Sequence, residues 1–162
     1  MLYKNCEDTL LSPLIERAKS FFIEDIGIDV VEEKNEKCQN EILFFYHTSI
    51  IALSGGIVGY FLMSYEKLIL EKTADSFVYG GVDEDEKEEI IESLADEVTN
   101  IILGNVLGSF TINGVDTNTT PPIQVAGISE ILIFSKKETI SLNINTSYGK
   151  VLLAFSADEI IF

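Results

Sequence analysis

The amino-acid sequence predicts an α+β fold in which an antiparallel sheet of long strands packs against three helices on one side. Two segments, 7–22 and 83–106, repeat their apolar residues at helical spacing, and a third, 65–77, contains good helix formers, which together indicate three helices. Two pairs of segments rich in aromatic and β-branched residues are each joined by a turn that contains glycine, which indicates two hairpins. With 162 residues, 46% of them hydrophobic, the chain is long enough for a substantial core, and we expect a single domain over residues 1–162.

The helices are expected at residues 7–22, 65–77 and 83–106. The first should begin its regular part near Ser12, because Pro13 suits the first position of a helix. The third is the longest, and Asp83 with Glu86 three residues later forms a capping-box pattern at its start. Its buried stripe is predicted to contain Ile90, Leu94, Val98, Ile101 and Asn105, with Ile91 and Ile102 beside it.

The strand segments form two long hairpins and several shorter pieces. The hairpins turn at Ser54-Gly55 and at Tyr148-Gly149, and a further strand should begin near Gly27. The polar stretch 34–40 and the stretch after Gly104, which is rich in glycine, asparagine and proline, are interpreted as irregular connections. The expected strands are 41–53, 56–64, 123–125, 128–134, 138–144 and 150–156, with 158–162 extending an edge or fraying.

Charge and cysteine content restrict the partners and the compartment. Eleven basic and 27 acidic residues give a net charge of −16, so neither nucleic acid nor an anionic membrane is an expected partner. Cys6 and Cys38 follow no CxxC pattern, and no apolar leader precedes them, so we expect free thiols in the cytoplasm. The most apolar stretch, residues 50–63, is shorter than the ~20 residues of a membrane-spanning helix.

A group of polar residues follows one line along the third helix. Ser93, Glu97 and Asn100 stand at i, i+4 and i+7, so they share one face. Helical spacing places this face at the border of the predicted buried stripe. A carboxylate and a carboxamide aligned on a rigid helix at the rim of a core indicate an edge for recognition or catalysis.

The same residues form a pattern known from a protein family. Ser93-x3-Glu97-x2-Asn100 is followed by Pro122 with twenty-one residues between Asn100 and the proline, and Gly104-Asn105 continues the helix. Together with the upstream segment 54–59, Ser-Gly-Gly-Ile-Val-Gly, this order resembles the signature of the CheC/CheX/FliY phosphatases, and the single helix of this type resembles the CheX branch. The resemblance implies an enzyme that removes phosphate from the phospho-aspartate of a CheY-type receiver domain in chemotaxis or another two-component pathway.

The resemblance also implies a role for each matching residue. Asn100 would orient the attacking water, and Glu97 would pair with the receiver's lysine. Ser93 would support them, and Pro122 would shape the loop that packs near the helix. This chain itself would bind no cofactor, because Mg²⁺ is expected in the partner receiver. A homodimer is expected as well, since long apolar edge strands such as the final hairpin need protection.

The two halves of the chain show a trace of duplication. Ser12-x3-Glu16-x2-Lys19 on the first helix echoes the pattern on the third, and the resemblance to CheC-like proteins implies a pseudo-two-fold repeat of helix and hairpin. Lys19 replaces the carboxamide, so one working site is expected, on the second copy. Helix–hairpin units also resemble one another without duplication, and both interpretations remain open.

Other interpretations of the same residues stay open. Ser93 and Glu97 can be solvated residues of an acidic helix, and the chain can be a non-catalytic CheX-like or flagellar-switch-like scaffold that keeps the fold. The intact pair of Glu97 and Asn100 favours the enzyme. Asn105 is interpreted as a structural amide, and the lone His47 as a structural residue. One histidine and two distant cysteines give no convincing metal site.

Overall fold

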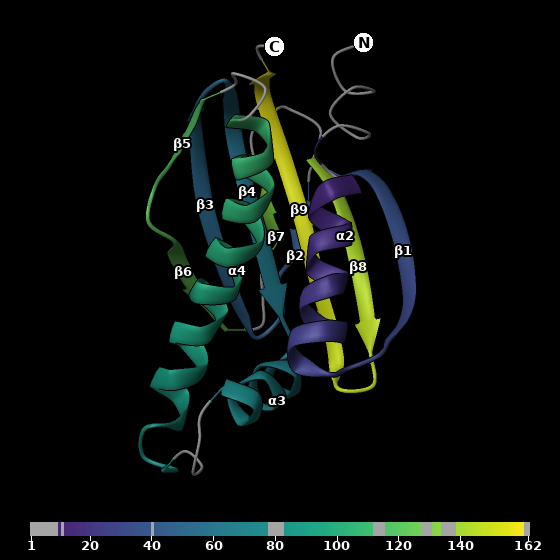
Figure 1. Cartoon of the computed structure of the whole chain (residues 1–162), viewed down its shortest axis with the longest axis vertical. Helices are drawn as coiled ribbons and strands as arrows, with labels where there is room; N and C mark the ends of the chain where they lie inside the picture. Colours follow the sequence, from purple (N-terminus) through teal and green to yellow (C-terminus); the bar gives the residue numbers. More distant parts are fainter. Residues whose placement is uncertain are drawn as a thin grey trace.

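The centre of the fold is a seven-stranded antiparallel sheet (Figure 1). A computed structural model describes residues 10, 12–39, 41–77, 83–111, 116–127, 131–133 and 139–160. Six strands follow one another across the sheet: β1 (Val30–Gln39), β8 (Thr139–Thr146), β9 (Gly149–Ile160), β4 (Ile57–Tyr65), β3 (His47–Gly55) and β5 (Thr117–Thr119). The seventh, β6 (Ile123–Ala126), pairs with the other end of β3.

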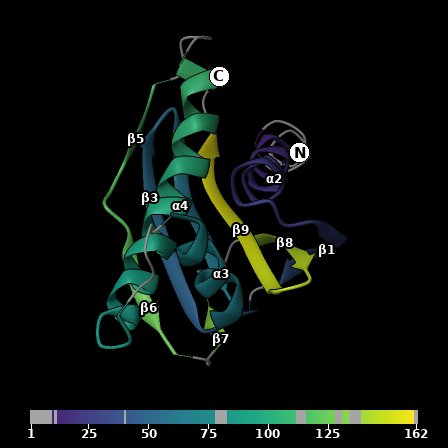
Figure 2. The same cartoon turned by 60° about the horizontal axis from the view of Figure 1, so that its bottom comes forward.

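Helices cover one face of this sheet and a small ribbon covers the other. The helical segments are α2 (Ser12–Ser20), its π-helical continuation η2 (Phe21–Ile26), α3 (Lys67–Phe77) and α4 (Lys87–Thr111). Figures 1 and 2 show α2 and α4 side by side over the sheet, with α3 near one end of both. A two-stranded sheet of β2 (Glu41–Leu43) and β7 (Ile131–Ile133) lies behind the main sheet in Figure 1. The fold is therefore the expected α+β fold.

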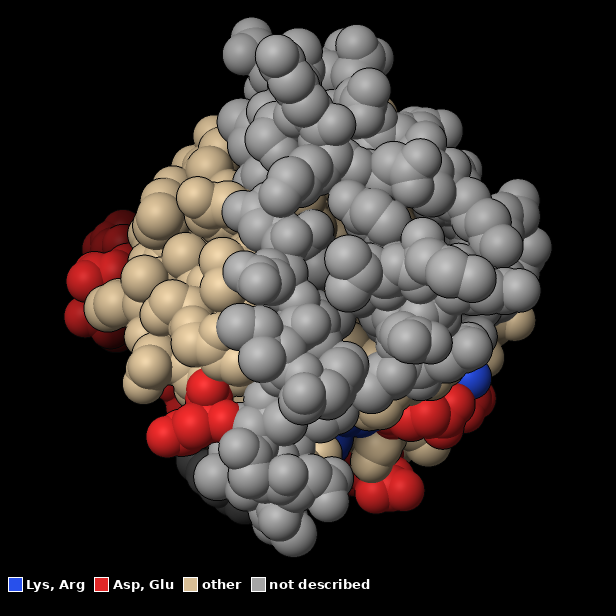
Figure 3. All heavy atoms as spheres, turned by 90° about the horizontal axis from the view of Figure 1, so that it is seen from above, with Lys and Arg blue, Asp and Glu red and all other residues tan. Residues whose placement is uncertain are grey.

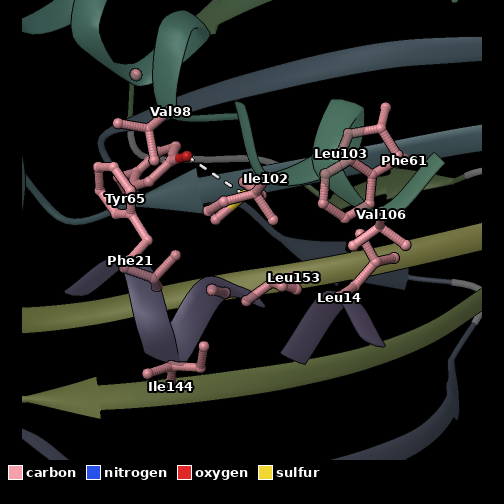
Figure 4. Packing of buried hydrophobic residues seen from close by; sticks show 14 of the residues in the cluster. Leu14, Phe21, Phe61, Tyr65, Val98, Ile102, Leu103, Val106, Ile144 and Leu153 are labelled. Carbon is pink, nitrogen blue, oxygen red and sulfur yellow. Dashed lines mark hydrogen bonds between the residues drawn. The ribbon is translucent and has the colours of Figure 1, made fainter. Parts of the chain in front are cut away.

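Both faces of the central strands are buried, which explains their long apolar runs. Residues of β3 and β4 alternate between two cores, as Ile51 faces the helices and Ile50 faces the β2–β7 ribbon. The larger core joins the sheet to all three helices, and Figure 4 shows Leu14 of α2 near Val106 and Leu103 of α4. Removing a side chain from this core costs about 2–5 kcal/mol, so the helices are held firmly against the sheet.

The two halves of the chain have the same connectivity. One half runs from a helix (α2) through β1, β2 and the β3–β4 hairpin, and the other runs from α4 through β5, β6, β7 and the β8–β9 hairpin. If each strand is exchanged for its counterpart in the other half, the pairing of β1 with β8 becomes the pairing of β6 with β3. The pairings of β4 with β9 and of β2 with β7 are unchanged by the exchange. This topology agrees with the expected pseudo-two-fold repeat, and α3 lies between the halves in the chain.

Glycine is required at the turn of each hairpin. Gly55 has φ +100°, and a Cβ there would lie 2.7 Å from the carbonyl oxygen of Asp116. Gly149 has φ +127°, and a Cβ there would lie 2.7 Å from a carboxylate oxygen of Glu66. Both conformations are ones that other residues rarely adopt, so the two predicted turns are confirmed for a steric reason.

Several predicted boundaries are wrong. The first helix continues past residue 22 as η2, while residues 7–9 lie outside the described part of the chain. The predicted polar connection 34–40 is mostly β1, which runs to Gln39 and pairs with β8 at the edge of the sheet. The first hairpin strand begins at His47, because 41–43 form the separate strand β2. The unpredicted β5 is only three residues long and pairs with the end of β3.

The third helix is shifted toward the C-terminus. Residues 84–86 form a turn in which Glu86 N–H donates to the carbonyl of Asp83 at 3.0 Å, and α4 begins at Lys87, so Asp83 does not cap it directly. At its other end α4 passes through Gly104 and Gly108 to Thr111 instead of ending near Val106. The cost of a helical glycine, about 1 kcal/mol relative to alanine, is outweighed by burial of Val106 and Leu107.

The final hairpin is also placed differently from the expectation. β9 lies in the middle of the sheet between β8 and β4, and β8 is covered in turn by β1. The final hairpin therefore exposes no long edge, and the edge-protection argument for a homodimer is wrong. Residues 158–160 belong to this central strand, and residues 161–162 lie outside the described part. The predicted short strand at 128–134 is described only as β7, Ile131–Ile133.

Candidate functional site

Helix α4 turns a different stripe toward the core from the predicted one. The buried residues are centred on Ala95 and Thr99, whereas Ile90, Leu94 and Ile101 are only partly buried. The prediction counted large apolar residues and so missed a small residue and a threonine whose hydroxyl is satisfied. The residues of α4 that are less than 9% exposed are Ile91, Ala95, Val98, Thr99, Ile102, Leu103, Val106 and Leu107.

Thr99 is satisfied by two neighbours inside the core. Its hydroxyl donates to the carbonyl of Ala95 at 2.8 Å and lies 2.8 Å from the hydroxyl of Tyr65. Tyr65 is also 3.4 Å from the sulfur of Met63, and Figure 4 shows its ring between Val98 and Phe21. Burial raises the pKa of Tyr65 far above its ordinary value. This contact fixes the inner face of α4 on β4.

The predicted motif residues all lie on the outer face of α4. Ser93, Glu97 and Asn100 are exposed, so they stand opposite the buried stripe and not at its border as the sequence predicted. Among the described residues, neither Glu97 nor Asn100 has a hydrogen-bond or ion-pair partner. A carboxylate and a carboxamide are thus brought together one turn apart on a firmly packed helix, with both side chains open to a partner.

A hollow of about 540 Å³ extends from Glu97 toward the start of α4. Partly buried Ile90 and Leu94 line it together with Ser93. Glu86 and Glu89 line it with Glu97 and give it an acidic edge. Figure 3 looks onto the other end of the molecule, and there too acidic side chains cover more of the described surface than basic ones. The face that carries the motif therefore combines apolar area with negative charge.

Pro122 lies outside this face. It is partly buried in the irregular connection between β5 and β6. Figures 1 and 2 show β6 beside α4, so the proline precedes a strand that runs along the motif helix. The structure thus brings Ser93, Glu97 and Asn100 together and places Pro122 where it sets the path of the chain into β6, because its ring restricts φ.

The residue next to Glu97 forms a polar cluster that the sequence did not predict. The hydroxyl of Ser49 donates to one carboxylate oxygen of Asp96, and the side-chain amide of Gln124 donates to the other. His47 Nε2 lies 3.8 Å from Asp96 Oδ1. We call these four residues the Asp96 anchor. His47 was interpreted as structural, and its buried position agrees with that. The one available signal was the spacing of His47 and Ser49, two polar residues on the same face of an apolar strand.

A second exposed cluster holds the beginning of α4. Glu88 accepts hydrogen bonds from Lys67 Nζ at 2.8 Å and from the hydroxyl of Tyr46, and the Lys67 ammonium lies 5.2 Å from the centre of the Tyr46 ring. The Lys67 ammonium, and then the Tyr46 hydroxyl, hold the pKa of the Glu88 carboxyl below its usual value. This cluster connects α4 to α3 and to the start of β3.

The corresponding position on the first helix carries no comparable pair. Ser12 and Glu16 are exposed, and Glu16 lies 3.8 Å from the ammonium of Lys19, which stands where α4 has Asn100. Glu16 is thus paired with a residue of its own helix, whereas Glu97 and Asn100 on α4 have no partner among the described residues. That only the second copy works stays a prediction.

The other predicted side chains have structural positions. Asn105 is exposed and not part of the buried stripe, and its amide donates to the carbonyl of Ile101 at 2.7 Å, as a structural amide would. Within the described ranges, no group of three histidine, cysteine, aspartate or glutamate side chains is arranged to hold a metal ion. No helix among these residues has the length and apolarity needed to cross a bilayer.

Comparison with known proteins supplies a family for this arrangement. A family model described as chemotaxis phosphatase CheX matches residues 47–146, a range that includes α4, Pro122 and the whole Asp96 anchor. No curated protein sequence matches the chain.

Solved structures share the fold over nearly the full length. Chemotaxis protein CheX from Desulfovibrio desulfuricans has a TM-score of 0.74 at 15% identity, covering 91% of this chain and 97% of that chain. The CheX–CheY–BeF3–Mg complex from Borrelia burgdorferi matches with a TM-score of 0.71 at 20% identity, covering 91% and 96%. FliY from Thermotoga maritima has a TM-score of 0.54 at 20% identity, covering 90% and 85%. At these identities the similarity establishes a common fold.

Proposed function

Because the chain belongs to the family of the chemotaxis phosphatase CheX, we propose that it hydrolyses the phospho-aspartate of a CheY-type receiver domain. The observation that carries the proposal is the open pair on α4: Glu97 and Asn100 are exposed on one face, without partners among the described residues. The solved relative from B. burgdorferi was crystallised with CheY, which supports a receiver as the partner.

In the proposed reaction this chain has to supply few of the reacting groups. A water oxygen attacks phosphorus, the bond from phosphorus to the aspartate oxygen breaks, and the aspartate leaves as a carboxylate while the water's proton goes to the phosphate product. The receiver supplies the Mg²⁺ and a lysine. What this chain adds is a positioned water, as in other phosphoryl transfers in which an amide side chain orients the attacking water.

Each motif residue has a part that its chemistry suits. The carboxamide of Asn100 offers both a donor and an acceptor and stays uncharged, so it can hold the attacking water in line with the scissile bond. Glu97 pairs with the receiver's lysine and aligns the two proteins. Ser93, one turn before Glu97, is small and leaves room for the receiver, while Pro122 sets the loop that leads to β6.

The test is the decay of phosphorylated receivers, taken from the same organism, with and without this protein. Asn100→Ala should lower the accelerated rate by about 10²–10³, the loss typical of one positioned catalytic donor. Glu97→Ala should lower the accelerated rate and should also raise KM for the phosphorylated receiver. Glu16→Ala is the matched control, because Glu16 is exposed at the equivalent place on α2 and should leave the rate unchanged. Decay by Asn100→Ala as fast as by the parent rules out Asn100 as the catalytic amide.

The same assay separates the enzyme from a scaffold. A non-catalytic CheX-like or flagellar-switch-like domain would retain a phosphorylated receiver in a pull-down without hastening its decay. The open Glu97 and Asn100 pair favours the enzyme, because binding alone does not require a free carboxamide.

We also propose that the chain forms a homodimer, on grounds other than the final hairpin. Among the described strands, the sheet ends at β1 on one side and at β5 and β6 on the other, so these are the edges a second copy can reach. Val31 on β1 is 69% exposed and Ile123 on β6 is 56% exposed, so each edge carries a large apolar side chain that a second copy could cover. Sedimentation equilibrium of the parent and of Val31→Lys and Ile123→Lys variants tests this, and a monomeric parent contradicts it.

A further inference from the structure

Asp96 and Asn100 are neighbours on the surface of α4. They stand at i and i+4, the spacing at which an aspartate and an amide side chain form hydrogen bonds along a helix. Such a bond would occupy the carboxamide of Asn100. In the structure this does not happen: Asp96 Oδ1 and Oδ2 accept hydrogen bonds from Ser49 and Gln124, and Asn100 has no partner among the described residues.

The pairing of strands β3 and β6 places the two donors, Ser49 and Gln124, next to each other. Ser49 on β3 and Gln124 on β6 are paired residues in the antiparallel ladder, so their side chains emerge side by side on the face under α4. The spacing of such a pair suits the two oxygens of one carboxylate. Ser49 is fully buried and the side chain of Asp96 is 18% exposed, so the contact between them has limited access to water, whereas the contact with Gln124 is exposed. His47 Nε2, also buried, lies on the same side at 3.8 Å from Oδ1.

We propose that Ser49 and Gln124 are positioning residues that hold the Asp96 carboxylate away from Asn100. The carboxamide of Asn100 then stays free to orient water, and the inference rests on the proposed function. It also gives Pro122 a more specific part. The proline stands two residues before Gln124 and restricts the backbone that leads this amide to Asp96.

An alternative is that Asp96 only ties α4 to the sheet. The two roles of Asp96 predict opposite changes in kcat when Asp96→Ala is added to a protein that already lacks the donors Ser49 and Gln124. The double variant Ser49→Ala/Gln124→Ala releases the carboxylate, which then captures Asn100. For a hydrogen bond along a helix surface that involves one charged group, kcat should fall about threefold to tenfold with KM little changed. Adding Asp96→Ala should restore kcat, because no carboxylate remains to compete for the amide.

A second readout does not depend on the receiver. The side-chain NH₂ signals of Asn100 in the free protein, assigned with Asn100→Ser, should shift in the double variant and return toward the parent positions in the triple variant. The side-chain signals of Asn105 are the control, since this amide bonds to Ile101 and should not move. Melting temperatures show that each variant is folded, and Gln124→Ala alone, at an exposed position, serves if the double variant does not fold.

The outcomes separate this inference from the proposed function. Asn100 signals that stay in place in the double variant overturn the inference, whether or not the parent is active. A kcat that falls in the double variant and falls further in the triple variant assigns a purely structural anchor and also overturns it. A parent that fails to hasten decay refutes the proposed function, and the Asn100 signals then still decide whether Asp96 is held away from the amide.

Discussion

The hydroxyl of Tyr65 lies 2.8 Å from Oγ1 of Thr99 and joins β4 to α4 inside the core. The same two hydroxyls also contact the carbonyl of Ala95 and the sulfur of Met63, so they form one buried chain of polar contacts. Tyr65→Phe removes the hydroxyl and should lower the free energy of unfolding by about 1 kcal/mol, the usual net value of one buried hydrogen bond. Urea denaturation measures this. Tyr148→Phe is the control, because the Tyr148 hydroxyl has no hydrogen-bond partner in the described part of the chain.

The same tyrosine predicts a pH dependence. Burial raises the pKa of Tyr65 in the folded state, which favours the neutral form there. Its contribution to stability is therefore complete below the ordinary tyrosine pKa of about 10 and is lost as the pH rises above it. The free energy of unfolding of the parent should fall more steeply above about pH 10 than that of Tyr65→Phe. Parallel alkaline slopes for the two proteins contradict this.

Glu88 predicts the opposite dependence on the acid side. The Lys67 ammonium and the Tyr46 hydroxyl lower its pKa, so its contribution to stability is present above the ordinary glutamate pKa and is lost as the pH falls through the lowered value. Glu88→Gln should therefore flatten the fall in unfolding free energy between about pH 5 and pH 3. Glu89→Gln removes one carboxylate from an exposed position on the same helix and serves as the control for the change in net charge.

The hairpin turn at Gly55 predicts a steric cost. Gly55→Ala meets both a positive φ and the carbonyl oxygen of Asp116, so it should lower the free energy of unfolding by roughly 2–3 kcal/mol. Gly27→Ala isolates the first effect, because Gly27 has φ +77° but open space around a Cβ. This control should lose about 1 kcal/mol. Equal losses for both variants would show that the contact with Asp116 relaxes without cost.

The acidic hollow beside Glu97 predicts a charge dependence of docking. Under the proposed function, Glu86→Lys and Glu89→Lys should raise KM for a phosphorylated receiver and leave kcat nearly unchanged, since both residues line the hollow but lie away from Asn100. The effect should shrink as salt is added, because salt screens exposed charges. Asp75→Lys makes the same change of charge on α3, and it should leave KM unchanged at every salt concentration.

Periodicity predicted the elements of this fold better than their faces. The hairpins were found because glycine turns and apolar runs are local signals. The first and third helices were found because their apolar residues recur, and the helix at 65–77 because it contains good helix formers. The face of α4 was misplaced because Ala95 and Thr99, at its buried centre, are not large apolar residues. A strand was expected to begin near Gly27, but the continuation of β1 through residues 34–39 was missed, because only the pairing with β8, over a hundred residues later, makes this charged stretch a strand.

The candidate site, like the fold, could be predicted from the sequence only in part. Ser93, Glu97 and Asn100 lie on one helix, so spacing along the sequence was enough to bring them together. The Asp96 anchor joins α4 to β3 and β6, and no local pattern links Asp96 to Gln124. Contacts of this kind depend on strand register, which is determined by the packing of the whole sheet.

Beyond Asn100, two exposed glycines continue one line along the surface of α4. Gly104 and Gly108 follow Asn100 by one and two turns, both are exposed, and a Cβ at either would meet nothing within 4 Å. A receiver that reaches Asn100 from this end can therefore lie directly against the helix backbone. Under the proposed function, a larger residue at Gly104 would therefore restrict which receivers can approach Asn100 by their size, while the side chains of Glu97 and Asn100 stay unchanged.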